Sequence, residues 1–431
     1  MPTAQLYPET RTASHTAPRG GLGILEHPDG QVEIVAPPGP PLGTTRVIEP
    51  LQVRGTFSPD EIRLNRRARR YQIRDALRGK VHAKGLAGCG RRIIADTDRV
   101  EVKTCGEVAH FTGLMTCGSI WACPVCQAKI RHARAQQVEK MLNRALEMGH
   151  GIEFVTLTAR HHAGQALAFL FSCTQDAWAA MLRDKTFKNL KAEMIEGLIV
   201  VREVTHGING WHPHLHLAVI TWRPLTPAQR AQLEEGFWRG WSHQLQRVGL
   251  SALRGPGVLV KPCTAAEGLA GYLCKVTADD GAIRSVSMEL TRSDLKRAGR
   301  GHRSPEQIAD DFTSTGDLGD LALLQEHQKA THRRRMMTCS RNLKLHLGLD
   351  EAEQTDEELA AAEVGGEVLL RMGRTAWQRI LDLGLPAHVL QVAERDGREG
   401  LRALMVEIAP DDFWHIVQPA PAAPTQGENG R

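Results

Sequence analysis

The sequence of 431 residues contains few tyrosines and no long apolar segment. It nowhere has 18 consecutive apolar residues, so a membrane-spanning helix is excluded. Its N-terminus lacks the basic and then apolar pattern of an export signal, which predicts a cytoplasmic protein. The nine cysteines, an odd number in a long chain, argue against a secreted disulfide scaffold and favour reduced thiols or a metal site.

Charge is distributed unevenly along the chain. The net formal charge is +5, but residues 350–417 carry 15 acidic residues and 6 arginines, while residues 418–431 are neutral. The first 349 residues therefore hold the whole positive excess. This pattern predicts a polyanionic partner for the basic part. The alternative is an ordinary soluble protein with uneven charge.

Composition divides the chain into five segments. Residues 1–57 are predicted to be disordered, because the first 50 contain nine prolines and six glycines. A basic helix and a Cys-rich module are predicted over 58–135, and a larger domain over 150–345. A small acidic helical module is predicted over 350–417, followed by a disordered tail over 418–431. The helix begins with the capping sequence Ser58-Pro59-Asp60-Glu61.

Arginines are the candidate DNA contacts of this chain. Four lie on the predicted basic helix, and three more form a run much later in the sequence. The alternative for both groups is a solvated basic face. The candidate residues are Arg66, Arg67, Arg69, Arg70, Arg333, Arg334 and Arg335.

The segment from 153 to about 277 predicts an α+β fold. Strands are predicted at 153–158, 198–204, 214–220 and 258–260, and helices at 165–184, from Thr226 onward, and at 264–277. The order is β-α-β-β-α-β plus a helix. This order is typical of a split βαβ arrangement, in which an antiparallel sheet carries two helices on one face.

Two histidines two residues apart, His214 and His216, are the sharpest candidate metal ligands. Side chains at this spacing on a strand share a face. If the preceding hairpin loop has four or six residues, Glu203 lies directly opposite His216 or His214 on that face. Two imidazoles and a carboxylate suit Mg²⁺ or Mn²⁺ in a phosphoryl-transfer site. The alternative is that both histidines are merely half-buried polar residues.

Tyr272 is the candidate nucleophile by elimination. The other two tyrosines, Tyr7 and Tyr71, lie in the Pro-rich N-terminal stretch and in the Arg-rich helix. Lys275 lies one helical turn after Tyr272 and shares its face. A nearby ammonium favours the phenolate. The alternative is an ordinary amphipathic tyrosine beside a lysine.

The third feature is a cysteine cluster in the first half of the chain. Cys105, Cys117, Cys123 and Cys126 form a C-x11-C-x5-C-x2-C pattern whose last pair is a typical zinc half-site. We therefore predict a structural Zn²⁺ site, with Cys89 and His110 as alternative ligands. Buried free thiols are the other interpretation.

Taken together, these motifs resemble the HUH endonuclease superfamily, and within it the replication initiator proteins of rolling-circle plasmids. The resemblance rests on the His214-Leu215-His216 strand, the strand with Glu203 and the Tyr272-Leu273-Cys274-Lys275 helix, and covers roughly residues 82–345. It implies a bacterial enzyme that nicks one strand at a plasmid origin through a tyrosine–phosphate link, leaves a free 3′-OH and later rejoins the strand. It also implies origin DNA as partner. A host helicase, replication proteins and a second copy of the chain are further possible partners.

One position departs from the pattern of such initiators. Where some have a glutamate four residues before the tyrosine, this chain has Gly268, and Glu267 fits a helix cap better. Four other functions remain open. An HUH transposase or a conjugative relaxase would use the same chemistry on different DNA. A histidine-triad nucleotide hydrolase would use His214 as nucleophile, and a zinc-containing DNA-binding regulator would not need Tyr272.

Overall fold

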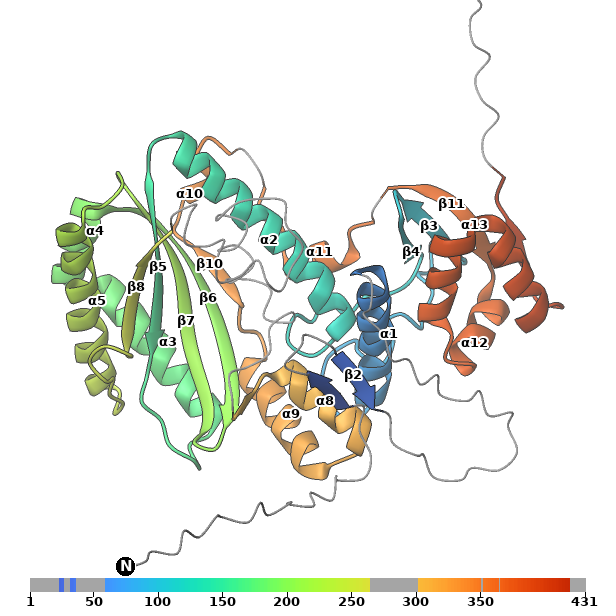
Figure 1. Ribbon diagram of the computed structural model, residues 1–431, viewed down its shortest axis with the longest axis horizontal. Coiled ribbons are helices and arrows are strands. Elements are labelled where there is room, and N and C mark those ends of the chain that lie inside the picture. The colour runs from blue at the N-terminus through green and yellow to red at the C-terminus, as the bar shows by residue number, and fades with distance from the viewer. Residues whose placement is uncertain are drawn as a thin grey trace, which may run out of the picture.

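The computed structural model describes residues 23–26, 32–35, 59–263, 301–349, 352–363 and 365–418. Two larger antiparallel sheets organise these residues, and Figure 1 shows them at opposite ends of the molecule. A separate two-stranded ribbon pairs β1 (Gly23–Glu26) with β2 (Val32–Val35). The region over 1–57, predicted to be disordered, therefore contains paired strands, whose sequences GILE and VEIV are rich in β-branched residues.

The larger sheet has the strand order β10-β6-β7-β5-β8, with every neighbouring pair antiparallel and β9 added alongside β6. The four strands predicted from the sequence all belong to it, together with two short strands that were not predicted. Their bounds are β5 (Gly151–Thr158), β6 (Ile195–Gly207), β7 (Gly210–Thr221), β8 (Val258–Pro262), β9 (His302–Arg303) and β10 (Met337–Cys339).

Helices cover both sides of the larger sheet. Figure 1 shows α4 (Lys185–Met194) and α5 (Pro227–Arg247) on one side and α2 (Pro124–Glu147) on the other. Helix α3 (Leu167–Arg183) packs against β7 and α5. The helix predicted from Thr226 onward is α5, and Thr226 and Gln229 form a capping box at its start. Its apolar residues Leu233, Phe237, Trp241 and Leu245 are buried. The predicted helix over 264–277 lies outside the described residues.

The smaller sheet joins two segments that are far apart in the sequence. Its order is β12-β11-β3-β4, and β11 pairs with β3. The strands are β3 (Val100–Cys105), β4 (Val108–Thr112), β11 (Glu367–Met372) and β12 (Trp414–Ile416), and helices α12 (Arg374–Asp382) and α13 (Pro386–Ile408) pack against them. The C-terminal segment was predicted as a separate helical module. That prediction was wrong, because two of its segments are strands that share a sheet and a core with residues 100–112.

The connecting helices lie between the two sheets. Helix α1 (Pro59–Leu77) begins at the predicted position and contacts α2, α8 and α13. The remaining helices are α8 (Pro305–Thr315), α9 (Leu318–Thr331), α10 (Leu343–His346) and α11 (Asp356–Ala361). Among the described helices, none is long and apolar enough to cross a bilayer.

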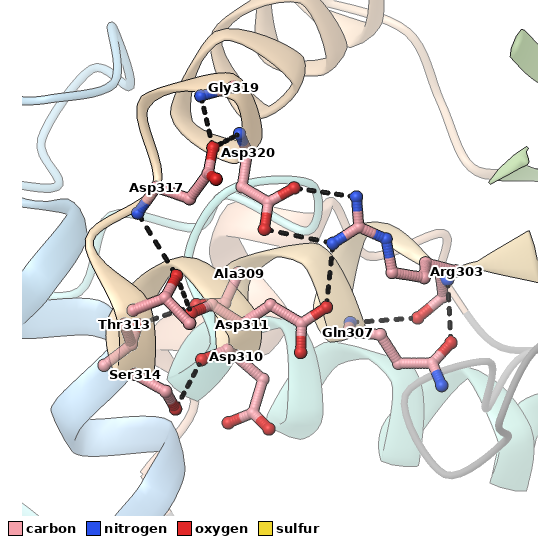
Figure 2. Close-up of polar contacts among 12 residues, drawn as sticks. Arg303, Gln307, Ala309, Asp310, Asp311, Thr313, Ser314, Asp317, Gly319 and Asp320 are labelled. Carbon is pink, nitrogen blue, oxygen red and sulfur yellow. Dashed lines mark hydrogen bonds and ion pairs between the residues drawn. The ribbon is translucent and has the colours of Figure 1, made fainter. Parts of the chain in front are cut away.

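An arginine ties β9 to the α8–α9 helix pair, as Figure 2 shows. Arg303 Nη2 donates to Asp320 Oδ1 at 2.7 Å, and Arg303 Nη1 donates to Asp320 Oδ2 at 3.0 Å and to Asp311 Oδ2 at 2.8 Å. Its neighbour His302 pairs with Gly207 at the end of β6. A Cβ added at Gly207 would lie 2.6 Å from His302 Nδ1, so the close approach of the two chains requires glycine there.

Candidate metal centres

The β6–β7 hairpin brings the predicted ligands together. Gly207 pairs with Gly210, so the turn is only Ile208 and Asn209, shorter than the four or six residues considered from the sequence. The register still places Glu203 directly opposite His214. His216, two residues further along β7, projects on the same face.

Both imidazoles approach the same carboxylate oxygen of Glu203. Glu203 Oε2 lies 3.2 Å from His214 Nε2 and 2.9 Å from His216 Nε2. One ligand atom from each residue lies within 4.8 Å of the other two. The side chains of His214 and Glu203 are 14% and 15% exposed, so the group is mostly buried but still accessible to solvent. The predicted set could therefore hold a metal ion.

In both imidazoles the second ring nitrogen, Nδ1, has a polar neighbour. Nδ1 of His214 lies 3.2 Å from the backbone oxygen of His212, and Nδ1 of His216 lies 3.2 Å from Oγ1 of Thr156. Phe154 stacks on His216 at 5.4 Å between ring centroids. A carbonyl only accepts, so Nδ1 of His214 carries the proton and its Nε2 presents a lone pair toward Glu203. A nitrogen lone pair and a carboxylate oxygen this close together are both available as ligand atoms for a cation.

Three further histidines border this centre, and sequence reasoning did not include them. The ring of His212 lies 5.4 Å from that of His214, 4.6 Å from that of His161 and 6.3 Å from that of His302. Burial, reinforced by the neighbouring histidines, lowers the pKa of His212 to about 3, so its ring is neutral. Strand alternation puts His212 on the face of His214 and could have identified it.

Four cysteines form a second candidate metal centre. The Sγ atom of Cys89 lies 3.8 Å from that of Cys123 and 3.5 Å from that of Cys126, and Cys117 Sγ lies 3.7 Å from Cys126 Sγ. A tetrahedral Zn²⁺ with Zn–S bonds of about 2.3 Å separates its sulfurs by about 3.8 Å, so the four thiols fit this ion. Cys123 precedes Pro124 at the start of α2, and Cys126 follows in the first helical turn.

The predicted zinc set contained Cys105 in place of Cys89, and this part was wrong. Cys105 is exposed at the end of β3, where it pairs with Val108 across the β3–β4 hairpin. His110 lies on β4 of the same hairpin. The hairpin belongs to the smaller sheet, so neither residue joins the cluster. Cys89, which was named only as an alternative, is buried and contacts the other thiols.

The predicted DNA-binding arginines have different surroundings. Arg67 pairs with Glu394 on α13, and Arg69 pairs with Asp310 on α8. Arg334 donates to Gln175 and Ser172 of α3. In contrast, Arg66 and Arg333 are exposed, and Arg335 forms a solvent-exposed ion pair with Glu353. Arg70 has an interaction of its own.

The candidate nucleophile cannot be placed. Tyr272 and Lys275 lie outside the described residues, as does Glu267. The strands that flank that segment are placed. β8 ends at Pro262 alongside β5, and β9 resumes at His302 alongside β6.

Comparison with known proteins gives two relatives. Protein rep of Streptomyces lividans is 30% identical over 369 residues, which cover 70% of this chain and 80% of that protein. Neomycin resistance protein of Streptomyces cyanogenus is 28% identical over 242 residues, which cover 48% of this chain and 54% of that protein. No family model matches the chain. No solved structure matches it.

Proposed function

Because this chain belongs to the family of plasmid Rep proteins, we propose that it initiates plasmid replication by nicking one DNA strand at the origin. The observation that carries the proposal is the convergence of Glu203, His214 and His216 on one face of the larger sheet. The order β5-α3-α4-β6-β7-α5-β8 is the split βαβ order with one extra helix, α4, and together with the neighbour order β8-β5-β7-β6 it supports a core of the HUH type. The paired imidazoles beside a carboxylate are the arrangement such a core requires.

Glu203, His214 and His216 would hold Mg²⁺ or Mn²⁺. When bound, the ion supplies positive charge for the oxygens of the scissile phosphate. The protein itself would hold the three ligand side chains in position. Thr156 and the backbone of His212 orient the imidazoles, and the hairpin register sets the carboxylate between them. The neutral ring of His212 adds no positive charge that would repel a cation.

Tyr272 is the proposed nucleophile, on sequence grounds. Its phenolate oxygen attacks the phosphorus, the bond from phosphorus to the 3′ oxygen breaks, and that oxygen takes up a proton as a free 3′-OH. The new bond joins the 5′ phosphate to the tyrosine. One phosphodiester is exchanged for another, so attack by a 3′-OH on the tyrosine–phosphate bond rejoins the strand. Lys275 would stabilise the phenolate before attack.

The experiment is adduct formation on origin DNA. A single-stranded oligonucleotide carrying the plasmid origin, labelled on the 3′ side of the nick site, is incubated with the protein and Mn²⁺ or Mg²⁺. A denaturing gel should show a covalent protein–DNA band that requires the ion. Tyr272→Phe should abolish the band, and the matched change Tyr7→Phe should leave it intact.

Other outcomes separate the alternatives. A band that survives in Tyr272→Phe would keep the enzyme class and reject this nucleophile. Tight origin binding with no band in the wild type would reject nicking and favour a zinc-containing DNA-binding regulator. Loss of the band in Glu203→Gln, with DNA binding retained, would link the chemistry to the metal centre.

A further inference from the structure

A fully buried arginine lies beside the cysteine cluster. Arg74 of α1 is 2% exposed. Its Nε contacts Asp75 Oδ1 at 3.1 Å, and its guanidinium lies 4.6 Å from the centroid of the Tyr71 ring. Its Nη2 atom is buried and has no hydrogen-bond partner among the described residues. A buried guanidinium with an unpaired nitrogen is costly unless another negative charge lies nearby.

The contacts of Arg74 place it against the segment that carries Cys89. A Cβ at Gly90, the next residue, would lie 2.3 Å from Arg74 Nη1, so the backbone here approaches the guanidinium as closely as glycine permits. Gly90 also has a positive φ of 65°. Arg78, the residue that follows the last residue of α1, donates from Nη2 to the backbone oxygen of Cys89 at 2.6 Å.

In the part of the chain that the structure describes, a single carboxylate contacts these two arginines. Asp75 is the carboxylate that contacts both of them, with its Oδ1 3.1 Å from Arg74 Nε and 2.8 Å from Arg78 Nε. Asp75 is also 39% exposed, so water weakens its field. Two guanidinium groups and one carboxylate leave one positive charge beside Cys89, which is itself 2% exposed.

The cysteine cluster supplies the missing negative charge once its thiols bind zinc. Four thiolates around Zn²⁺ carry a net formal charge of about −2. Cys123 and Cys126 are buried like Cys89, and Cys117 is half-buried, so water stabilises only a small part of that charge. We propose that Arg74 is the buried counter-cation of the zinc centre and strengthens zinc binding through its charge. The inference rests on the proposed zinc site.

The electrostatics of the arginine agree with this role. Burial alone would lower the pKa of Arg74, but the neighbouring Asp75 carboxylate is the largest influence that opposes burial, and the net shift is upward. Lys129 of α2 is a further cation near the cluster. Burial lowers the pKa of Lys129, and its ammonium donates to the backbone oxygen of Ala360 at 2.9 Å and to that of Ala362. Lys129 therefore also links α2 to the segment after α11, whereas the Nη2 atom of Arg74 is uncommitted.

The test measures zinc affinity in the full-length protein. Zinc is titrated against a chromophoric chelator for the wild type, Arg74→Met, Arg74→Lys and the exposed control Arg66→Met, with folding checked by circular dichroism. We expect Arg74→Met to weaken zinc binding about 10–100-fold, the range seen when a partner outside the ligand set is removed. Arg74→Lys should lose less than Arg74→Met because it keeps the charge, and Arg66→Met should match the wild type.

A second variant keeps the test informative if Arg74→Met fails to fold. Asp75→Asn removes the carboxylate that offsets Arg74, so zinc binding should be unchanged or tighter, and weaker binding would overturn the proposal. Equal losses in Arg74→Met and Arg74→Lys would also overturn it, because shape rather than charge would then matter. A wild type that binds no zinc would overturn the zinc site itself, whereas a zinc-binding wild type matched by a folded Arg74→Met would overturn only the role of Arg74.

Discussion

The ion pair between Arg67 and Glu394 gives the sharpest test of how the smaller sheet is attached. Arg67 Nη1 and Nη2 donate to Glu394 Oε1 and Oε2 at 2.6 and 2.9 Å, and the backbone nitrogen of Ala109 donates to Oε1 at 2.8 Å. The side chains are 14% and 6% exposed. Glu394→Gln leaves a buried guanidinium without its counter-charge, which costs about 3–5 kcal/mol. Arg67→Met leaves a buried carboxylate and should cost a similar amount.

Urea unfolding of the wild type, both single variants and the double variant measures this pair. If the two charges are coupled, the double variant should cost clearly less than the sum of the single costs, because no buried charge remains unpaired. Single costs below about 1 kcal/mol would refute a buried bidentate link, since that is the range of exposed ion pairs.

A comparison of Arg67 with the exposed Arg66 distinguishes arginines that stabilise the fold from arginines that contact DNA. Each lost phosphate contact reduces the slope of log affinity against log salt concentration by about one. Replacing the exposed Arg66 by Ala should therefore reduce the slope if it contacts DNA, whereas Arg67→Met should leave the slope unchanged. An equal reduction for both variants would contradict the assignment of Arg67 to Glu394.

Three further predictions concern the two metal centres and pH. Glu203→Gln should weaken Mn²⁺ binding at least about tenfold, as measured by calorimetry, because it removes a charged ligand. The control His162→Gln, at an exposed residue, should leave the affinity unchanged. Equal affinities of Glu203→Gln and the wild type would reject the carboxylate as a ligand. Cys89→Ser should lower the zinc content measured by atomic emission, and Cys105→Ser should not; the reverse result would restore the sequence-based ligand set. Burial, with a smaller contribution from Arg131, lowers the pKa of His327 to about 3. The unfolded chain takes up a proton at this residue below pH 6.5 and the folded chain does not, so stability falls as pH drops from 6.5 toward 3, by about 1.4 kcal/mol per pH unit. His327→Gln should make urea unfolding less sensitive to pH between 7 and 5, and an unchanged sensitivity would refute the buried neutral state.

The sequence predicted the larger sheet and its candidate metal centre because both depend on local patterns. Strand alternation alone places His214 and His216 on one face. A hairpin symmetric about residues 208 and 209 then fixes the partner of His214 as Glu203. These relations hold within 14 consecutive residues. Helix α4 was missed because its short amphipathic sequence follows α3 directly, with Asp184 as both the end of one helix and the cap of the next.

The cysteine ligands and the smaller sheet depend on contacts between distant parts of the chain. Spacing suggested Cys105 because it precedes Cys117 in a regular series. The actual position of Cys105 is set by β3, which pairs with β11 more than 250 residues later. Cys89 joins the cluster because the loop after α1 folds back onto α2. No local sequence pattern indicates either contact. The sequence therefore limited the candidate zinc ligands to a few residues but could not decide between Cys89 and Cys105.

Ion pairs between distant parts of the chain change the interpretation of its uneven charge distribution. The basic first part and the acidic C-terminal part were interpreted as evidence for a polyanionic partner, yet they neutralise each other in part. Glu394 pairs with Arg67, and Asp356 pairs with Arg134 of α2 at 2.8 Å. Such arginines are committed to the fold and release no counterions from DNA. If the chain binds origin DNA as proposed, we expect the phosphate contacts to come from exposed cations such as Arg66, Arg333 and Arg335. The slope of log affinity against log salt concentration should then be smaller than the charge of the first 349 residues implies.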